Sequence, residues 1–421
     1  MSGSGVLHAI ATANRSGVAS GISSWCTAHP DTLRAILRAH GGSQGPILIE
    51  ATCNQVNQHG GYTGMTPTAF RGFIEGLAAE TAIDSRRIIL GGDHLGPNPW
   101  RQLPAAAAMA EAKSMVRAYV EAGFAKIHLD ASMACADDGL LAEASMADRA
   151  AELCAVAEAA ASQSLTYVIG TEVPVPGGET AALDTLAVTS PEAALNTHAL
   201  HQAAFARLGL EGALARVVAI VVQPGVDFGN AQVFPFVAEK AARLSAAIAA
   251  IPNAVFEAHS TDYQNPGSLA GLVASHFAIL KVGPELTFAY REAVFAMAAI
   301  EEQLAVATPS RVIACIDNVM NHDDKYWRSY VAPSEQQRVL KLFGLSDRVR
   351  YYWPDAAIAQ AVGLLRTNID SAVVPPGLLA QYAGADIPQD GRPLSTRIID
   401  RKVGAVVAKY LAACGSAALP Q

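Results

Sequence analysis

The sequence predicts an α/β protein built as a (β/α)8 TIM barrel with a C-terminal helical appendage. Short runs rich in Val, Ile and Leu alternate with longer Ala-rich stretches, and eight such pairs fill residues 1–305. The short runs are continuously apolar, as expected for strands buried on both faces of a parallel sheet. A doubly wound open sheet is the alternative. It is disfavoured because eight units fill a barrel and no Gly-x-Gly-x-x-Gly follows the first run.

The apolar runs define the expected strands, and the longer stretches between them define the expected helices. Thr66-Pro67 and Ser190-Pro191 mark helix starts, because proline is favoured in the first turn of a helix. The strands are expected near 17–22, 46–50, 86–91, 125–130, 165–171, 216–222, 254–258 and 276–282. The helices are expected near 30–41, 66–82, 103–122, 139–162, 190–208, 233–250, 264–274 and 285–305.

Two regions are expected along the chain. Residues 1–305 should form the barrel and carry the active site. Residues 306–421 do not continue the alternation and are typical of helices joined by loops that contain Pro354 and Pro375-Pro376. We expect this second region to pack on the barrel as a lid, an oligomer contact or both.

Composition excludes several classes of protein. Of 421 residues, 51% are hydrophobic and 16% are charged, which indicates a large buried core and not a disordered chain. The net charge of -8 and the lack of a basic patch disfavour a nucleic-acid partner. Six dispersed cysteines indicate free thiols in a reducing compartment. Without a leader or a long apolar run, we expect a cytoplasmic protein with no membrane contact, forming a homo-oligomer.

Polar side chains stand where nearly every expected strand ends, and in this fold those ends build the active site. The third strand ends at Asp93 and His94, and the seventh at His259. Two imidazoles with nearby carboxylates can hold a divalent metal that keeps open positions for substrate. A metal bound to a ketose carbonyl and its adjacent hydroxyl acidifies the neighbouring carbon. We therefore expect His94 to bind the metal and Asp93 to move protons.

Other residues near the strand ends have weaker or alternative roles. His128 shares a strand face with Asp130 and is expected only to pack. Lys281 is open to three interpretations, as a Schiff-base nucleophile, a helix cap or a phosphate partner. The last two loops form the usual phosphate corner of this fold. Substrate or phosphate contacts are expected from Glu50, Asn54, Ser132, Ser260, Thr261, Lys281, Thr287 and Arg291.

Long motifs in fixed order resemble the GatZ/KbaZ-like family over essentially the whole chain. They are GGDHLGPN, KIHLDASMACADD, YVIGTEVPVPGGE, VVQPGVDFG, FEAHSTDYQ, LKVGPELTFAYREA and SDRVRYYW. Members of that family are known as non-catalytic subunits of class II tagatose-bisphosphate aldolase and were formerly labelled tagatose 6-phosphate kinases. Some relatives act as ketose 4-epimerases, notably on tagatose 6-phosphate.

The family is in turn similar to the metal-dependent class II aldolases. The resemblance implies that Asp93 and His94 match their catalytic acid and metal ligand, and that His259 matches a later ligand. Their Glu followed by Gly-Gly corresponds to Glu172 with Gly177-Gly178. One departure is that Gln223 occupies the place of another ligand histidine. Either Gln223 substitutes as a ligand, or Glu172 or Asp130 enters the metal shell.

The residues and the resemblance together lead to three candidate functions. The leading one is a metal-dependent isomerase, a 4-epimerase that interconverts D-tagatose 6-phosphate and D-fructose 6-phosphate by a retro-aldol and aldol route through a metal-bound enediolate. Here Asp93, with Asp130 or Glu172, would shuttle the C4 hydroxyl proton. His94, His259 and Gln223 would hold the metal. Zinc is the first expectation for this metal, and manganese, nickel or magnesium are the alternatives. The alternative is a non-catalytic stabilising partner of an aldolase catalytic subunit. A sugar kinase is disfavoured, because no Gly-x-x-x-x-Gly-Lys-Ser/Thr motif is present.

Overall fold

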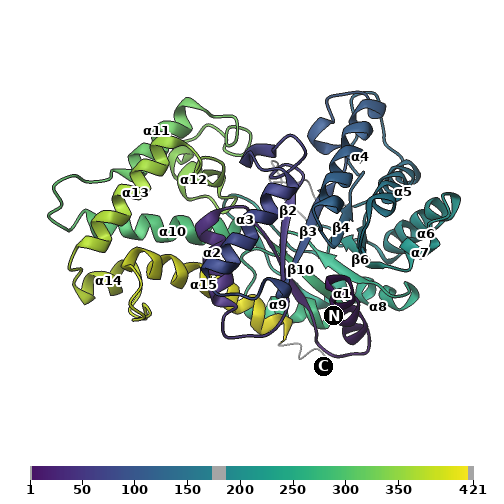
Figure 1. Cartoon of the computed structure of the whole chain (residues 1–421), viewed down its shortest axis with the longest axis horizontal. Helices are drawn as coiled ribbons and strands as arrows, with labels where there is room; N and C mark the ends of the chain where they lie inside the picture. Colours follow the sequence, from purple (N-terminus) through teal and green to yellow (C-terminus); the bar gives the residue numbers. More distant parts are fainter. Residues whose placement is uncertain (1, 173–185, 416–421) are drawn as a thin grey trace.

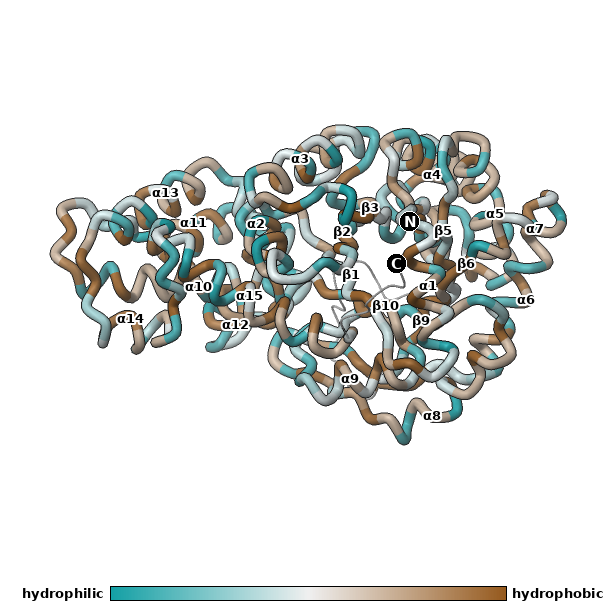
Figure 2. The backbone as a smooth tube through the Cα atoms, turned by 60° about the horizontal axis from the view of Figure 1, so that its bottom comes forward, coloured by the Kyte–Doolittle hydropathy of each residue, from teal (hydrophilic) through white to brown (hydrophobic). Residues whose placement is uncertain are grey.

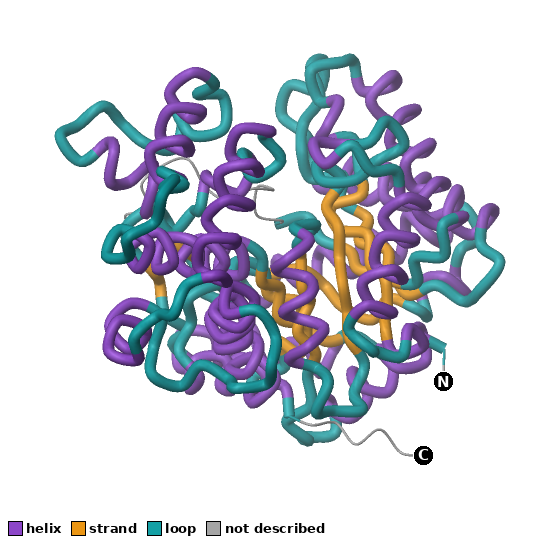
Figure 3. The backbone as a smooth tube through the Cα atoms, turned by 60° about the vertical axis from the view of Figure 1, so that its left-hand side comes forward, coloured by secondary structure: helices purple, strands orange, loops and turns teal. Residues whose placement is uncertain are grey.

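A closed barrel of eight parallel strands forms the centre of the molecule in this computed structural model, which describes residues 2–172 and 186–415. Around the barrel the strands run in the order β1, β2, β3, β4, β5, β6, β9, β10 and back to β1. Their bounds are β1 Ile22–Cys26, β2 Ile47–Thr52, β3 Ile88–Leu95, β4 Lys126–Leu129, β5 Thr166–Ile169, β6 Val217–Val222, β9 Val255–Ala258 and β10 Phe277–Val282. Figure 3 shows these strands surrounded by helices. The predicted fold class is therefore confirmed.

The first strand lies later in the chain than predicted. The apolar pattern placed it at 17–22, but β1 begins at Ile22 and contains the adjacent serines Ser23 and Ser24. Both serines are buried, and hydroxyl groups within the strand removed the apolar pattern by which a buried strand is recognised. A small antiparallel hairpin, β7 Asp227–Phe228 with β8 Val233–Phe234, follows β6 and was also not predicted.

The outer helices begin where the sequence provides caps. Proline stands in the first turn of α2, α3, α6 and α9, and the preceding His29, Thr66, Ser190 or Asn265 accepts a hydrogen bond from a backbone amide of that turn. The outer layer consists of α2 Pro30–Ala39, α3 Pro67–Glu80, α4 Ala105–Glu121, α5 Glu143–Ala160, α6 Pro191–Arg207, α7 Glu211–Leu214, α8 Ala238–Ala247 and α9 Pro266–Ala274. Short 3-10 turns, η1 Gly61–Thr63, η2 Ser85–Arg87, η3 Asn98–Trp100 and η4 Ile248–Ala250, lie in the connections.

An additional helix, α1 Gly3–Arg15, packs against the amino-terminal end of the barrel strands. Val6, Leu7 and Ile10 are buried in one apolar cluster with strand residues that include Ile22 and Leu48. The helix contacts β6, β9 and β10. No helix was predicted from the sequence at residues 3–15, so α1 is an addition to the predicted fold. Because α1 covers one end of the barrel, the carboxyl ends of the strands are left to form the functional mouth.

Replacing Leu7 by alanine is expected to destabilise the protein by about 2–5 kcal/mol, the usual range for truncating a buried leucine. Leu7 is 2% exposed and belongs to the apolar cluster beneath the strands. The change would be measured as a shift of the urea midpoint. Thr12→Ala is the control, because Thr12 lies on the exposed side of the same helix. Equal midpoints for the two variants would show that α1 adds no stability to the barrel.

The chain after β10 leaves the barrel and then returns to it. α10 Pro284–Glu301 contacts α11 Val312–His322, α13 Ala356–Ser371 and α14 Pro376–Tyr382, and these helices gather on one side of the barrel (Figures 1 and 2). The last helix, α15 Leu394–Cys414, packs against α2, α9, α10 and β1. It therefore completes the outer layer between α9 and α2. Helix α12 Gln337–Phe343 and the turn η5 Arg348–Tyr351 lie between α11 and α13.

Polar contacts fasten the returning helix to the barrel. Tyr410 donates a hydrogen bond to the carbonyl oxygen of Thr261 at 2.7 Å, and Lys409 pairs with Glu285. Asp400 pairs with Arg38 of α2 at 3.1 Å. The region 306–421 was predicted as an appendage. Its described part, up to residue 415, supplies part of the barrel's outer layer through α15 and also forms a side lobe, by which we mean α11 to α14 with η5 (residues 312–382). Over the described ranges, no helix combines the length and apolar character needed to cross a bilayer.

Candidate metal centre at the barrel mouth

Strands β3 and β4 approach each other closely where their polar ends meet. A Cβ added at Gly96 would lie 1.6 Å from the carbonyl oxygen of Asp130, so only glycine allows this approach. A Cβ at Gly91 would lie 2.7 Å from Oε1 of Glu50. His94 has a φ of 51° and Ser260 a φ of 53°, an uncommon backbone conformation for residues with side chains. Strain of this kind clusters at functional sites.

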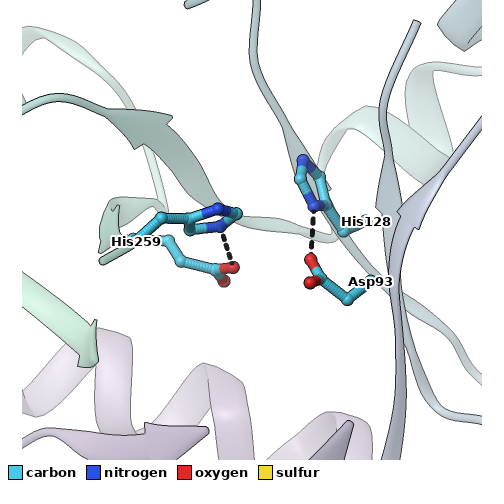
Figure 4. A group of neighbouring side chains, drawn as sticks. Asp93, His128 and His259 are labelled. Carbon is cyan, nitrogen blue, oxygen red and sulfur yellow. Dashed lines mark hydrogen bonds and ion pairs between the residues drawn. The ribbon is translucent and has the colours of Figure 1, made fainter. Parts of the chain in front are cut away.

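Four buried side chains form a group that can hold a metal ion. One ligand atom from each of Asp93, His128, Glu257 and His259 lies within 4.8 Å of the others. Figure 4 shows Asp93 and His128, which are joined by a hydrogen bond, opposite His259. The Nδ1 atom of His128 lies 2.9 Å from Oδ1 of Asp93, and Nε2 of His259 lies 3.0 Å from Oε1 of Glu257. We call these four residues the metal group.

The donor atoms of this group fit a cation. The Nε2 atom of His128 is buried and makes no hydrogen bond within the described chain, although a buried polar atom without a partner is costly. Burial lowers the pKa of His259 to about 4, so its imidazole is neutral, as a metal ligand must be. Two imidazoles and two carboxylates suit zinc and neighbouring divalent ions. Such an ion, when bound, would act as a Lewis acid toward a carbonyl oxygen.

Two buried lysines lie beneath the metal group. Lys126 Nζ lies 2.6 Å from Oε1 of Glu50 and 2.8 Å from Oε2 of Glu257, and all three side chains are inaccessible to solvent. Lys281 pairs with Glu50 and lies 2.9 Å from Oδ1 of Asp93. Each carboxylate of the metal group is therefore paired with a buried lysine, Asp93 with Lys281 and Glu257 with Lys126. We call Lys126, Lys281, Glu50 and Glu257 the ion network.

The neighbouring charges set the protonation of the mouth. Burial alone would raise the pKa of Asp93, but His94 and Lys281 lower it well below its ordinary value. Burial alone would lower the pKa of His94, but Asp93 and Asp130 raise it. Asp93 is therefore ionised, and His94 favours its charged form.

One cavity of about 590 Å³ opens over this centre. Its inner end is lined by Asp93, His94, His259 and Lys281, and its outer wall includes residues of η5 and α13. The size is typical of a pocket for a small organic ligand. The side lobe therefore contributes directly to the wall of the candidate site.

The predicted ligand and acid residues differ in how close they lie to the metal group. His94 lies beside the metal group, with its ring centroid 5.0 Å from that of His259, but its Nδ1 binds Asp130 at 2.8 Å. The hydroxyl of Ser132 also binds Asp130, at 2.6 Å. Gln223, predicted as a ligand, differs: its amide oxygen accepts hydrogen bonds from the backbone of residues 225 and 226 and holds the turn after β6. It does not belong to the metal group.

Glu172 also lies outside the metal group. Its side chain is exposed and accepts a hydrogen bond from Thr189 at 2.6 Å, and it does not line the cavity. The following Gly177-Gly178 pair lies outside the described residues. Asn54 and Ser260 line the cavity, whereas Glu50 belongs to the ion network below it.

The expected phosphate corner is occupied by the protein's own groups. The hydroxyl of Thr261 donates to the carbonyl oxygen of Lys281 at 2.7 Å. Thr287 donates to the buried carboxylate of Asp347 at 2.5 Å, and Arg291 pairs with that carboxylate at 3.3 Å. Arg291 also donates to the carbonyl oxygen of Leu342 at 2.6 Å. Arg291 therefore joins α10 to the side lobe, whereas the sequence predicted that it would contact phosphate.

Sequence reasoning missed His128, Glu257 and Lys126 as parts of the site. His128 was interpreted as a packing residue. The signal was the two-residue period of a strand, because Lys126, His128 and Asp130 point to one side, as do Glu257 and His259. A polar residue at every second position of a buried strand indicates a polar barrel interior at that level.

Comparisons with known proteins agree over most of the chain. The model of the family described as D-tagatose-1,6-bisphosphate aldolase subunit GatZ/KbaZ-like matches residues 7–415. A relative from Klebsiella pneumoniae subsp. pneumoniae, named D-tagatose-1,6-bisphosphate aldolase subunit GatZ, is 51% identical over 380 residues, which cover 89% of this chain and 90% of the relative. A relative of the same name from Salmonella newport is 50% identical over the same shares.

A solved structure shows the same architecture. A protein described as a probable tagatose 6 phosphate kinase from Sinorhizobium meliloti 1021 has 44% sequence identity and a TM-score of 0.87. The match covers 94% of this chain and 100% of that chain.

These names overturn the expectation of an isomerase. The curated relatives are named as subunits of an aldolase, which is a carbon–carbon lyase, and neither name describes an epimerase. The resemblance to the family is confirmed by the family model and by the identity of about half of all aligned residues. This chain therefore belongs to the GatZ/KbaZ-like family of D-tagatose-1,6-bisphosphate aldolase subunits.

Proposed function

We propose that this protein is a subunit of a D-tagatose-1,6-bisphosphate aldolase and acts together with a separate catalytic aldolase chain. The observation that carries the proposal is the identity of about half the residues, over about nine-tenths of both chains, with relatives named as that subunit. Because the similarity extends over about nine-tenths of the chain, it includes the side lobe as well as the barrel.

The proposal includes a divalent ion in the metal group. Asp93, His128, Glu257 and His259 would hold it, and zinc is the first candidate because two neutral imidazoles and two carboxylates match its preferences. Manganese, nickel and magnesium are alternatives. The burial of all four side chains supports this part, because buried polar and charged groups need partners.

The ligand of the mouth is proposed to be a phosphorylated ketohexose. The cavity is large enough for a sugar phosphate and is lined at its inner end by groups that can bind sugar hydroxyls. Asp93 is ionised and can accept a hydrogen bond from a hydroxyl, whereas His94 and Lys281 can donate to oxygen atoms. These groups would orient the sugar at the barrel mouth.

The experiment compares three samples: this protein, a catalytic aldolase chain from the same organism, and their mixture. Cleavage of D-tagatose 1,6-bisphosphate would be followed by release of triose phosphates. We expect no cleavage by this protein alone, and in the mixture a complex on size-exclusion chromatography with a longer half-life of activity than the catalytic chain has alone.

Two outcomes contradict the proposal. One is cleavage by this protein alone at the rate of the mixture. The other is a mixture in which no complex forms and the half-life does not change. Repeating the mixture with the variant Leu7→Ala controls for general destabilisation, because Leu7 is buried at the opposite end of the barrel.

A further inference from the structure

One positively charged side chain reaches both the metal group and the cavity. Lys281 of β10 lines the inner end of the cavity. Its ammonium nitrogen lies 2.9 Å from Oδ1 of Asp93 and 3.9 Å from Oε1 of Glu257, and it also pairs with Glu50. Three carboxylates around the ammonium group favour its charged form. Lys281 is therefore a cation beside both carboxylates of the metal group.

The oxygen atoms that Lys281 approaches are the ones that face the imidazoles of the metal group. Oδ1 of Asp93 lies 2.9 Å from Nδ1 of His128 (Figure 4). Oε1 of Glu257 lies 3.0 Å from Nε2 of His259. An ion that joins each carboxylate to its imidazole would bind these same oxygen atoms. The ammonium group of Lys281 therefore neutralises the atoms that such an ion would use.

Lys281 and a divalent ion cannot both hold Oδ1 of Asp93 closely, because two positive charges repel each other strongly at short range in a buried site. Lys281 can yield without losing all its partners. Its ion pair with Glu50 does not involve Asp93. An ammonium group that leaves Asp93 therefore keeps one carboxylate partner and has one N–H donor to place elsewhere.

Lys126, the other lysine of the ion network, is placed differently. Its Nζ lies 2.8 Å from Oε2 of Glu257, whereas His259 faces Oε1. The side chain of Lys126 is completely inaccessible to solvent, so it cannot reach a ligand in the cavity. Of these two lysines, Lys281 alone lies between the metal group and the cavity.

We propose that Lys281 releases Asp93 when a divalent ion occupies the metal group, and then donates a hydrogen bond to an oxygen atom of the ketose in the cavity. An ammonium group has donors and no acceptor, so a sugar oxygen can replace the carboxylate oxygen that it gives up. This inference rests on the divalent ion and the phosphorylated ketohexose of the proposed function. It adds that one side chain neutralises Asp93 without the ion and binds the sugar with it.

The test measures two affinities of the full-length protein by isothermal titration. Lys281→Met is expected to bind Zn²⁺ about 10- to 100-fold more tightly after chelator treatment, the range for one charge-assisted hydrogen bond, because the competing cation is gone. With Zn²⁺ present, the same variant should bind D-tagatose 1,6-bisphosphate about 10-fold more weakly, because a donor to the sugar is lost. A residue with a merely structural role would weaken both.

A second variant and a control keep the test independent of folding. Lys281→Gln retains a donor for Glu50 but has no charge, so it should show both changes to a smaller extent even if Lys281→Met does not fold. Lys409→Met is the matched control. Lys409 pairs with Glu285 and donates to the carbonyl oxygen of Gln264, so its loss removes a lysine ion pair without touching Asp93. Both affinities should stay unchanged.

The outcomes separate this inference from the proposed function. Zn²⁺ affinity that is unchanged or lower in both Lys281 variants overturns the competition for Asp93. Unchanged bisphosphate binding by both variants, with a wild type that binds the bisphosphate, overturns the contact with the ketose. A wild type that binds no bisphosphate overturns that contact and the proposed ligand together, while the competition is judged by the Zn²⁺ titration and the assembly with an aldolase chain by the cleavage assay.

Discussion

Replacing His128 by alanine is expected to remove tight binding of a divalent cation, with a loss of affinity beyond about 100-fold. Loss of a residue that only supports a metal ligand typically costs 10- to 100-fold, and loss of a ligand should cost more. His128 is one of four buried side chains whose ligand-type atoms lie within 4.8 Å of one another. Binding would be measured by titrating Zn²⁺ into chelator-treated protein and by the metal content after dialysis.

The matched control for His128→Ala is His201→Ala. His201 is also fully buried and also has an Nε2 atom without a partner, but it lies on α6 and its Nδ1 contacts the carbonyl oxygen of Thr197. Its loss should cost stability and leave Zn²⁺ affinity unchanged. Equal Zn²⁺ affinity in wild type and His128→Ala would rule out the metal group as the ligand set.

A third variant separates this ligand set from the one expected from sequence. His94→Ala should weaken Zn²⁺ less than His128→Ala, because Nδ1 of His94 is bound to Asp130 and its Nε2 faces Oδ2 of Asp93 at 3.5 Å. A larger effect of His94→Ala would restore His94 as a principal ligand.

The fold was predictable because its elements are locally encoded. Continuous apolar runs and proline-capped helices are visible within windows of ten to twenty residues, roughly the length of one element. β1 shows the limit of this approach: Ser23 and Ser24 are buried, but nothing in their immediate neighbourhood requires it. The return of α15 to the barrel is equally invisible in sequence, since its contacts with α2 and α9 join distant segments.

A place at the barrel mouth was predictable where a strand end alone identifies a residue, and Asp93, His94 and His259 line the cavity there. Membership of the metal group depends instead on register between strands, because Gly91 of β3 pairs with Lys126 of β4 and thereby sets His128 beside Asp93. Gln223 shows that a place at a strand end is not enough to make a ligand. It follows β6, as a ligand from that strand would, but its amide oxygen accepts a hydrogen bond from the backbone of its own turn.

Replacing Lys126 by methionine is expected to destabilise the protein by about 3–5 kcal/mol, the cost of leaving buried charges without their partner. Lys126 is completely buried between Glu50 and Glu257, with both distances below 3 Å (2.6 and 2.8 Å). Methionine preserves most of the volume, so the loss reports charge and not a cavity. The measurement is the urea midpoint followed by circular dichroism.

Lys113→Met is the matched control, because Lys113 pairs with Glu152 at 2.7 Å on the surface, with side chains 39% and 47% exposed. An exposed pair of this kind contributes at most about 1 kcal/mol. Lys126→Met combined with Glu50→Gln should recover part of the loss, since one uncompensated charge is then removed. Equal midpoints for the two lysine variants would contradict the ion network as a source of stability.

The pH dependence gives an independent check on the same network. Burial alone would raise the pKa values of Glu50 and Glu257, but Lys126 lowers both below their ordinary value. A carboxylate with a lowered pKa contributes stability above its unfolded pKa of about 4.3 and loses it as the pH falls. Lys126→Met removes much of that contribution, so the gap in unfolding free energy between wild type and variant should narrow below about pH 4. A gap that stays constant from neutral to acid pH would mean that the variant loses packing, and that the charges of Glu50 and Glu257 are not held by Lys126.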